Sequence, residues 1–208
     1  MSGLTMPATR PDKQEVPLSE RGPSTRRVII GYGFWLFLLS DIIVFSALFA
    51  AYAVLSGNTA GGPTGLQLFH RQNVLLETGF LLLSSFTCGV LSLAIDIRHR
   101  ALTYSFAAMT FALGVAFLLL ELREFADMLA HGAGPQRSAF LSAFFALVGM
   151  HGLHVTIGLC WLASMMAQVA TLGYSPMVVG RLVCFSLFWH ALDIVWIGVF
   201  TIVYLGAR

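Results

Sequence analysis

The chain has 208 residues, of which 57% are hydrophobic and only 11% are charged, and its formal net charge is +2 at pH 7. Because about a quarter of the residues in a soluble domain are charged, this composition excludes an ordinary soluble domain and indicates a membrane protein. The small net charge gives no support to nucleic-acid binding. Each cysteine stands alone in an apolar run, which predicts neither a disulfide framework nor a thiolate metal site; they are Cys88, Cys160 and Cys184.

The first 27 residues differ from everything that follows. They contain four prolines, several charges and few apolar residues, a composition that predicts a disordered tail. A transmembrane helix needs about 20 mostly apolar residues, and five such runs lie downstream, at 28–55, 73–96, 101–125, 138–170 and 181–206. The sequence therefore predicts an all-α, polytopic membrane protein in which residues 28–208 form one bundle of five transmembrane helices.

The links between the runs carry turn-forming residues and most of the charge. SGNTAGGPTG follows the first run, and HGAGPQRS precedes the fourth, where Ser138 is placed to cap the helix. Cytoplasmic loops carry an excess of Lys and Arg. The side that holds the tail has Arg10, Lys13, Arg21, Arg26, Arg27, Arg98, Arg100 and Arg181, and the other side has Arg71, Arg123, Arg137 and Arg208. This imbalance predicts a cytoplasmic N-terminus and a periplasmic C-terminus.

Ionisable residues inside the apolar runs are the most informative feature of the sequence. A charged side chain at the bilayer centre costs about 2.5–3.5 kcal/mol on insertion scales, so such groups face other protein or a wet cavity. His151 and His154 are three residues apart, and so are His190 and Asp193. The members of each pair therefore share one helix face. We expect a buried structural network in which His151, His154, His190 and Asp193 join the fourth and fifth runs and Glu124 reaches them from the third run.

Two further carboxylates lie inside other runs. Asp41 is near the middle of the first run, and Glu77 is near the outer end of the second. We expect both to be buried, either at a lipid-lined cleft or in a proton-related role. The fourth run also holds three glycines that would let a neighbouring helix approach closely; they are Gly149, Gly152 and Gly158.

The residues alone leave three functions open for these polar groups. They form a packing network in a subunit of a larger assembly, or they carry protons, as chains of Asp, Glu and His do in pumps. Alternatively, histidines on facing helices bind a haem or a metal ion. The sequence has neither the Glu-x-x-His pairs of a di-iron bundle nor the GK[ST] motif of a P-loop.

Four segments, in chain order, carry a family likeness. GFWLFLLSDIIVFSALF (33–49) resembles the helix with a mid-membrane carboxylate in subunit III of haem–copper respiratory oxidases. ELREF (121–125) resembles the end of the family helix that carries a glutamate followed by an aromatic residue, here Glu124 and Phe125. HGLHV (151–155) resembles the family motif HGxHV, and FWHALDIVW (188–196) resembles the WHxxDxVW segment of the last helix. The likeness is closest to the bo3-type ubiquinol oxidases, because the chain lacks room for the first two helices of the seven-helix members.

The resemblance implies a non-catalytic subunit III of a proton-pumping haem–copper quinol oxidase, which couples ubiquinol oxidation to oxygen reduction in the aerobic respiratory chain of a bacterial inner membrane. Subunit I would hold the haems and copper, and a subunit other than this chain would bind the quinol. No catalytic, cofactor-binding or metal-binding residue is then expected in this chain. Its expected partners are subunits I, II and IV and membrane phospholipids, and its expected role is to pack against subunit I and stabilise the complex. The alternatives are a direct part in proton uptake through Asp41, where mitochondrial-type members have a glutamate, and a haem-binding membrane anchor.

Overall fold

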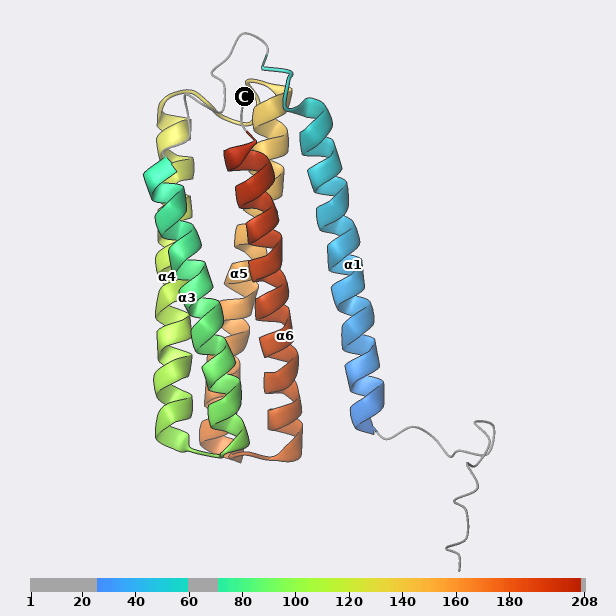
Figure 1. Cartoon of the computed structure of the whole chain (residues 1–208), viewed down its shortest axis with the longest axis vertical. Helices are drawn as coiled ribbons and strands as arrows, with labels where there is room; N and C mark the ends of the chain where they lie inside the picture. Colours follow the sequence, from blue (N-terminus) through green and yellow to red (C-terminus); the bar gives the residue numbers. More distant parts are fainter. Residues whose placement is uncertain (1–25, 60–70, 207–208) are drawn as a thin grey trace, which may run out of the picture.

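Every regular element that the structure describes is a helix (Figure 1). The structure is a computed structural model and describes residues 26–59 and 71–206. Its elements are α1 (Arg26–Leu55), α3 (Arg71–Asp96), α4 (Arg100–Ala130), α5 (Ala139–Leu172), α6 (Pro176–Val199) and a π-helical segment, η2 (Phe200–Leu205), that continues α6. Five helices within these ranges are long and apolar enough to cross a membrane. The predicted all-α fold with five spans is confirmed.

Most of the predicted tail lies outside the described residues. Of the range 1–27, residues 26 and 27 belong to α1, and the rest is not described. The disorder expected for the tail therefore stays a prediction. Part of the glycine-rich link after the first span, from residue 60 onward, also lies outside the described ranges.

Serine side chains set the beginnings of the last two α-helices. The Ser138 hydroxyl accepts a hydrogen bond from the Leu141 N–H at 3.2 Å, so the predicted cap of α5 is confirmed. The Ser175 hydroxyl accepts from the Val178 N–H at 3.4 Å, and Pro176 lies in the first turn, where its missing N–H costs nothing. α6 therefore begins before the predicted position 181, and α4 likewise continues past its predicted end at 125.

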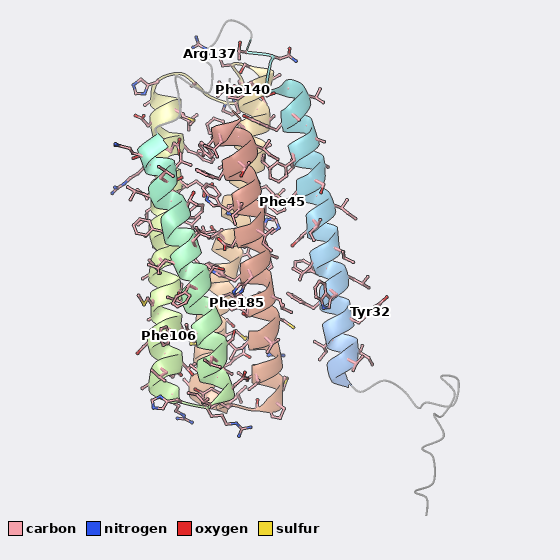
Figure 2. All side chains as sticks on the ribbon, in the orientation of Figure 1. Tyr32, Phe45, Phe106, Arg137, Phe140 and Phe185 are labelled. Carbon is pink, nitrogen blue, oxygen red and sulfur yellow. The ribbon has the colours of Figure 1, made fainter. Side chains whose placement is uncertain are left out.

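The helices α3, α4, α5 and α6 pack around a common core, and α1 lies on one side of them (Figure 1). α1 packs mainly against α5 and α6, and its buried residues Leu38, Phe45 and Tyr52 recur every seven positions. This spacing keeps one narrow stripe of a helix facing its neighbours. Figure 2 shows Phe45 on the side of α1 that faces the bundle and Tyr32, which is 68% exposed, on the other side.

Because the number of spans is odd, the first span begins at one end of the bundle and the last span finishes at the opposite end. α1 begins at one end, where the α3–α4 and α5–α6 links also lie, and η2 finishes at the other end (Figure 1). Arg98 and Arg181 belong to the first end and Arg137 to the second. Which end faces the cytoplasm stays a prediction from the distribution of Lys and Arg.

Candidate functional site: polar groups inside the bundle

The ionisable residues that the sequence assigns to one network lie in separate parts of the bundle. We call them the Asp41–His154 pair, the acidic cluster (Glu77, Glu121 and Glu124), and the α3–α6 groove, which His190 and Asp193 line. His151 lies apart from these groups, in the aromatic core.

The Asp41–His154 pair is a polar link between α1 and α5. The Nε2 atom of His154 lies 3.7 Å from Oδ1 of Asp41, and the two side chains are 14% and 21% exposed. This separation is an electrostatic contact and is too long for a direct hydrogen bond. The His154 Nδ1 atom lies 2.8 Å from the Met150 carbonyl oxygen, and because a carbonyl only accepts, Nδ1 carries the hydrogen. Nε2 is therefore the ring atom presented to Asp41.

His151 faces the core, although it is less than one turn from His154. Its side chain is fully buried, and neither ring nitrogen has a hydrogen-bond partner among the described residues. The ring packs against Trp196 at a centroid distance of 5.1 Å and against Phe117 at 5.7 Å and an interplanar angle of 89°. His151 thus acts as an aromatic contact that joins α5 to α4 and α6.

The acidic cluster gathers three glutamates from α3 and α4. Glu77 is fully buried, Glu121 is 3% exposed and Glu124 is half-buried. The three carboxyls lie within electrostatic range of one another, and Tyr204 of η2 lies near all of them. Both carboxyl oxygens of Glu77 are without a hydrogen-bond partner within the described ranges. Glu124 was expected to join the histidines and Glu121 was assigned to no site, although the spacing of three residues between Glu121 and Glu124 signals a shared helix face.

The three cysteines differ in their burial and form no disulfide with one another. Cys88 is buried, Cys184 is half-buried and Cys160 is exposed, and all three are free. Across residues 26–59 and 71–206, no group of three or more His, Cys, Asp or Glu side chains is arranged to hold a metal ion.

Two of the three predicted glycines permit a close helix approach. A Cβ atom at Gly152 would lie 2.8 Å from Oε1 of Glu121, and a Cβ atom at Gly158 would lie 2.8 Å from Cζ3 of Trp189. At Gly149 the nearest atom would be 3.8 Å away, an ordinary contact, so the expectation is wrong there. α5 therefore meets α4 at Gly152 and α6 at Gly158, where any larger residue would push a neighbour away.

The two tryptophans that frame His190 and Asp193 make hydrogen bonds from α6 to α3. The Trp189 indole N–H donates to the Ser84 hydroxyl at 3.0 Å, and the Trp196 indole N–H donates to the Thr78 hydroxyl at 3.1 Å. A buried indole N–H needs such a partner, and a spacing of seven residues places both donors on one face of the helix. The sequence pattern did not predict either of these hydrogen bonds.

Replacing Thr78 by valine tests one of these hydrogen bonds. Valine keeps the shape of threonine but leaves the Trp196 N–H unpaired, so we expect the free energy of unfolding to fall by about 0.6–1.7 kcal/mol, as for other polar contacts between membrane helices. Thr201→Val is the matched control, because that exposed hydroxyl donates to the Ile197 carbonyl of its own chain segment at 2.8 Å. Unfolding in micelles with increasing dodecyl sulfate measures both variants. Equal losses from the two would contradict a role for the contact between helices.

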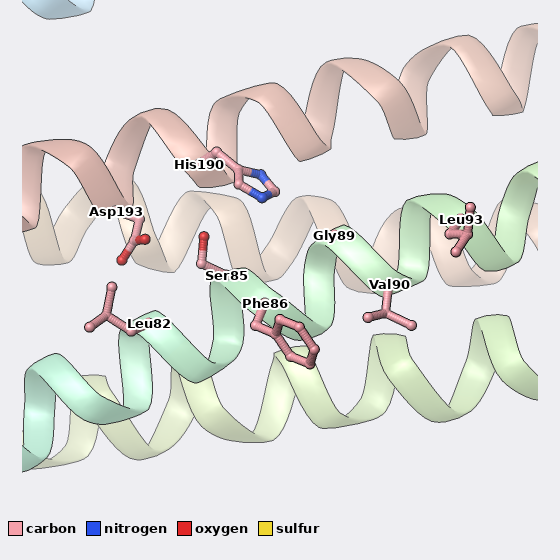
Figure 3. A pocket seen from close by; sticks show the side chains of 8 residues that line it. All are labelled: Leu82, Ser85, Phe86, Gly89, Val90, Leu93, His190 and Asp193. Atoms are coloured by element: carbon pink, nitrogen blue, oxygen red, sulfur yellow. The ribbon is translucent and has the colours of Figure 1, made fainter.

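The α3–α6 groove contains both His190 and Asp193, so their predicted shared face is confirmed (Figure 3). Asp193 is 8% exposed, its Oδ1 atom has no hydrogen-bond partner in the described part of the chain, and Ser85 of α3 lines the groove with it. The His190 Nδ1 atom lies 2.6 Å from the Ser186 carbonyl oxygen. The two residues therefore face α3, and α5, the helix of the other two histidines, is not their neighbour in this groove.

Comparison with known proteins gives a consistent set of relatives. The sequence model of the family described as cytochrome c oxidase subunit III matches residues 18–207. The chain is 54% identical over 173 residues to the cytochrome bo(3) ubiquinol oxidase subunit 3 of Pseudomonas putida. This match covers 83% of this chain and 84% of that protein. It is 51% identical over 174 residues to the protein of the same name from Pseudomonas aeruginosa, covering 84% and 83%. It is 42% identical over 175 residues to the quinol oxidase subunit 3 of Bacillus subtilis, covering 83% and 85%.

Proposed function

Because this chain belongs to the cytochrome c oxidase subunit III family, we propose that it is the non-catalytic subunit III of a proton-pumping haem–copper quinol oxidase in a bacterial inner membrane. The observation that carries the proposal is the 54% identity, over 83% of the chain, to a relative named cytochrome bo(3) ubiquinol oxidase subunit 3. In this proposal the complex oxidises ubiquinol and reduces oxygen. Subunit I holds the haems and copper, and the quinol that is oxidised binds to a subunit other than this chain.

The proposed role of the chain is to pack against subunit I, beside subunits II and IV, and to stabilise the complex together with bound phospholipids. The surface of α1 supports a role in contacts with lipid or protein, because large apolar side chains such as Trp35, Ile42 and Ile43 are 50–69% exposed. The polar groups inside the bundle support a structural role, because they link pairs of helices. Asp41 meets His154 between α1 and α5, and Trp189 meets Ser84 between α6 and α3.

Purifying the oxidase from cells with and without this chain tests the proposal. We expect the chain to co-purify with a haem-bearing subunit. We also expect the complex without it to keep its haem spectrum and its initial rate of quinol oxidation, but to lose activity faster during turnover, because subunit I has lost a stabilising neighbour. Failure to co-purify would contradict the assignment, and so would a stoichiometric Soret band from the chain purified alone.

A direct part in proton uptake is the second candidate, and the Asp41–His154 contact of 3.7 Å is the observation in its favour. Asp41→Asn keeps the size of the side chain and removes its charge and its proton-accepting oxygen. We expect the ratio of pumped protons to electrons to be unchanged in proteoliposomes, because the pair serves to hold α1. Asp96→Asn, at an exposed position, is the matched control. A lower ratio in Asp41→Asn alone, with normal assembly, would establish the proton-uptake role instead.

A further inference from the structure

The α3–α6 groove is an open apolar channel with a small polar site inside it (Figure 3). It has a volume of about 520 Å³, and its apolar walls are formed by Leu82, Phe86, Val90 and Leu93. Gly89 lies between these side chains, and a Cβ atom there would still be 3.9 Å from Nε2 of His190. The missing side chain therefore leaves a recess directly beside the histidine.

The polar site presents hydrogen-bond acceptors to the groove. Asp193 is 8% exposed and its Oδ1 atom has no partner among the residues that the structure describes, and Ser85 lines the groove with it. The His190 Nδ1 atom carries its hydrogen toward the Ser186 carbonyl at 2.6 Å, since a carbonyl only accepts. In the neutral ring, Nε2 is then the lone-pair acceptor, and it is the ring atom that points toward Gly89. The site is built to receive a donor.

The depth of the groove limits which molecules can supply that donor. The last span runs from Pro176 to Leu205, and at ~1.5 Å per residue His190 lies near its middle. Phospholipids offer only acyl chains at that depth, and their ester carbonyls accept hydrogen bonds and do not donate them. Leu82, Phe86 and Leu93 are 46–67% exposed, so the groove opens to the lipid. A ligand that enters the groove from the lipid is therefore soluble in the bilayer, and a hydroxyl group would supply the donor that these acceptors lack.

We propose that the α3–α6 groove binds a lipid-soluble quinol. One phenolic hydroxyl donates to Oδ1 of Asp193 or Nε2 of His190, the ring occupies the recess at Gly89 beside Phe86, and the isoprenoid tail follows the apolar walls. The groove selects the reduced form, because a carbonyl oxygen of a quinone would face the lone pair of His190 Nε2 without a hydrogen between them. The inference rests on the proposed function for the nature of the lipid pool. It concerns binding alone, and the oxidation of quinol stays with the haem-bearing subunit.

A transmembrane helix of another subunit is the competing occupant of the groove. Such a helix would lie across Leu82, Phe86 and Leu93 and would have to fill the recess at Gly89 with one of its own side chains, because protein interiors are densely packed. An apolar side chain of such a helix would leave the Asp193 and His190 acceptors without a donor, whereas a quinol brings a hydroxyl group to them. The polar site therefore favours the quinol.

The test uses the whole oxidase complex in lipid nanodiscs, kept anaerobic so that the probe stays reduced. An azido-substituted ubiquinol analogue is photolysed with the complex, and labelled peptides are identified by mass spectrometry. We expect label on the peptides of α3 and α6 that hold Gly89 and His190. The reduced analogue is expected to give at least about tenfold more label than the oxidised analogue, which corresponds to a difference of about 1.4 kcal/mol in binding free energy. Unlabelled ubiquinol is expected to compete for the site.

Two variants make the test specific. Gly89→Leu fills the recess and is expected to abolish the groove label, whereas Gly79→Leu, at another exposed glycine of α3 with no atom within 4 Å, leaves it unchanged. Asp193→Asn adds an N–H donor at the site, so the preference for the reduced analogue is expected to shrink and labelling by the oxidised form to rise. This second variant keeps the test valid if Gly89→Leu fails to assemble.

Three results would overturn the proposal. They are no groove label in the wild type, equal label in wild type and Gly89→Leu, and a crosslink from Gly89→Cys to another subunit, which would identify a helix as the occupant. Ubiquinol oxidase activity is measured on the same sample. A failure of the proposed function is then read from the rate, and a failure of the groove is read from the label.

Discussion

Replacing Trp189 by alanine is expected to lower the free energy of unfolding by about 3–5 kcal/mol, the usual cost of removing a large buried aromatic side chain. The Trp189 side chain is 3% exposed and packs against Phe185 at a centroid distance of 5.6 Å. It also lies directly against the positions of Gly114 and Gly158. Its N–H donates to Ser84, so the substitution leaves a cavity between α4, α5 and α6 and removes a hydrogen bond to α3. Unfolding in dodecyl sulfate micelles measures the loss.

Trp35→Ala is the matched control for this prediction. Trp35 is 55% exposed on α1, so its removal leaves no cavity, and we expect a change within about 0.5 kcal/mol. A comparable loss from the two variants would show that the Trp189 effect comes from the chemistry of tryptophan in micelles and is unrelated to its place in the core.

Replacing Gly158 by leucine is expected to cause the second large loss in the free energy of unfolding. A Cβ atom at Gly158 would lie 2.8 Å from Cζ3 of Trp189 and 3.2 Å from Cε1 of Phe188. Both rings are buried, so neither is a flexible chain end that can move aside. Overpacking of this kind costs about 1–3 kcal/mol, and the leucine atoms beyond Cβ add to it. The same micelle titration measures the change.

Two further variants separate overpacking from a general effect of glycine replacement. Gly180→Leu places the same side chain on α6 where no atom lies within 4 Å, and we expect little change. The double variant Gly158→Leu with Trp189→Ala is expected to lose less free energy of unfolding than the sum of the two single variants. The reason is that the cavity left by Trp189→Ala accommodates the leucine side chain of Gly158→Leu. Strict additivity would contradict the packing described here.

The helices were predictable from the sequence because each span is apolar along its own length. The start of α6 at Pro176, before the predicted position 181, was also predictable. Ser175 followed by Pro176 is a helix-start signal that lies outside the apolar run. Position 149 shows the limit of the same reasoning. The pattern of glycines indicates a helix that neighbours approach, but it does not tell which of Gly149, Gly152 and Gly158 the neighbour touches.

The partners of the polar residues were not predictable in the same way. In a soluble helix the apolar face marks the core, but lipid is as apolar as the core, so hydropathy does not distinguish the inner face from the outer one. The spacing of His190 and Asp193 correctly gave a shared face, yet nothing in it pointed to α3 and Ser85. Likewise, His151 and His154 have the spacing of a pair, but one packs among aromatic rings and the other meets Asp41.

The position of α1 has a consequence for the synthesis of the chain. α1 is the first span to be made, but its packing partners, α5 and α6, are the last. At the usual rates of translation, α5 follows Asp41 by a time on the order of ten seconds. During that interval α1 is held in the bilayer by its hydropathy alone, and Asp41 faces lipid before His154 exists. Slower translation of the central helices would lengthen the period in which a new chain carries an unshielded carboxylate in the membrane.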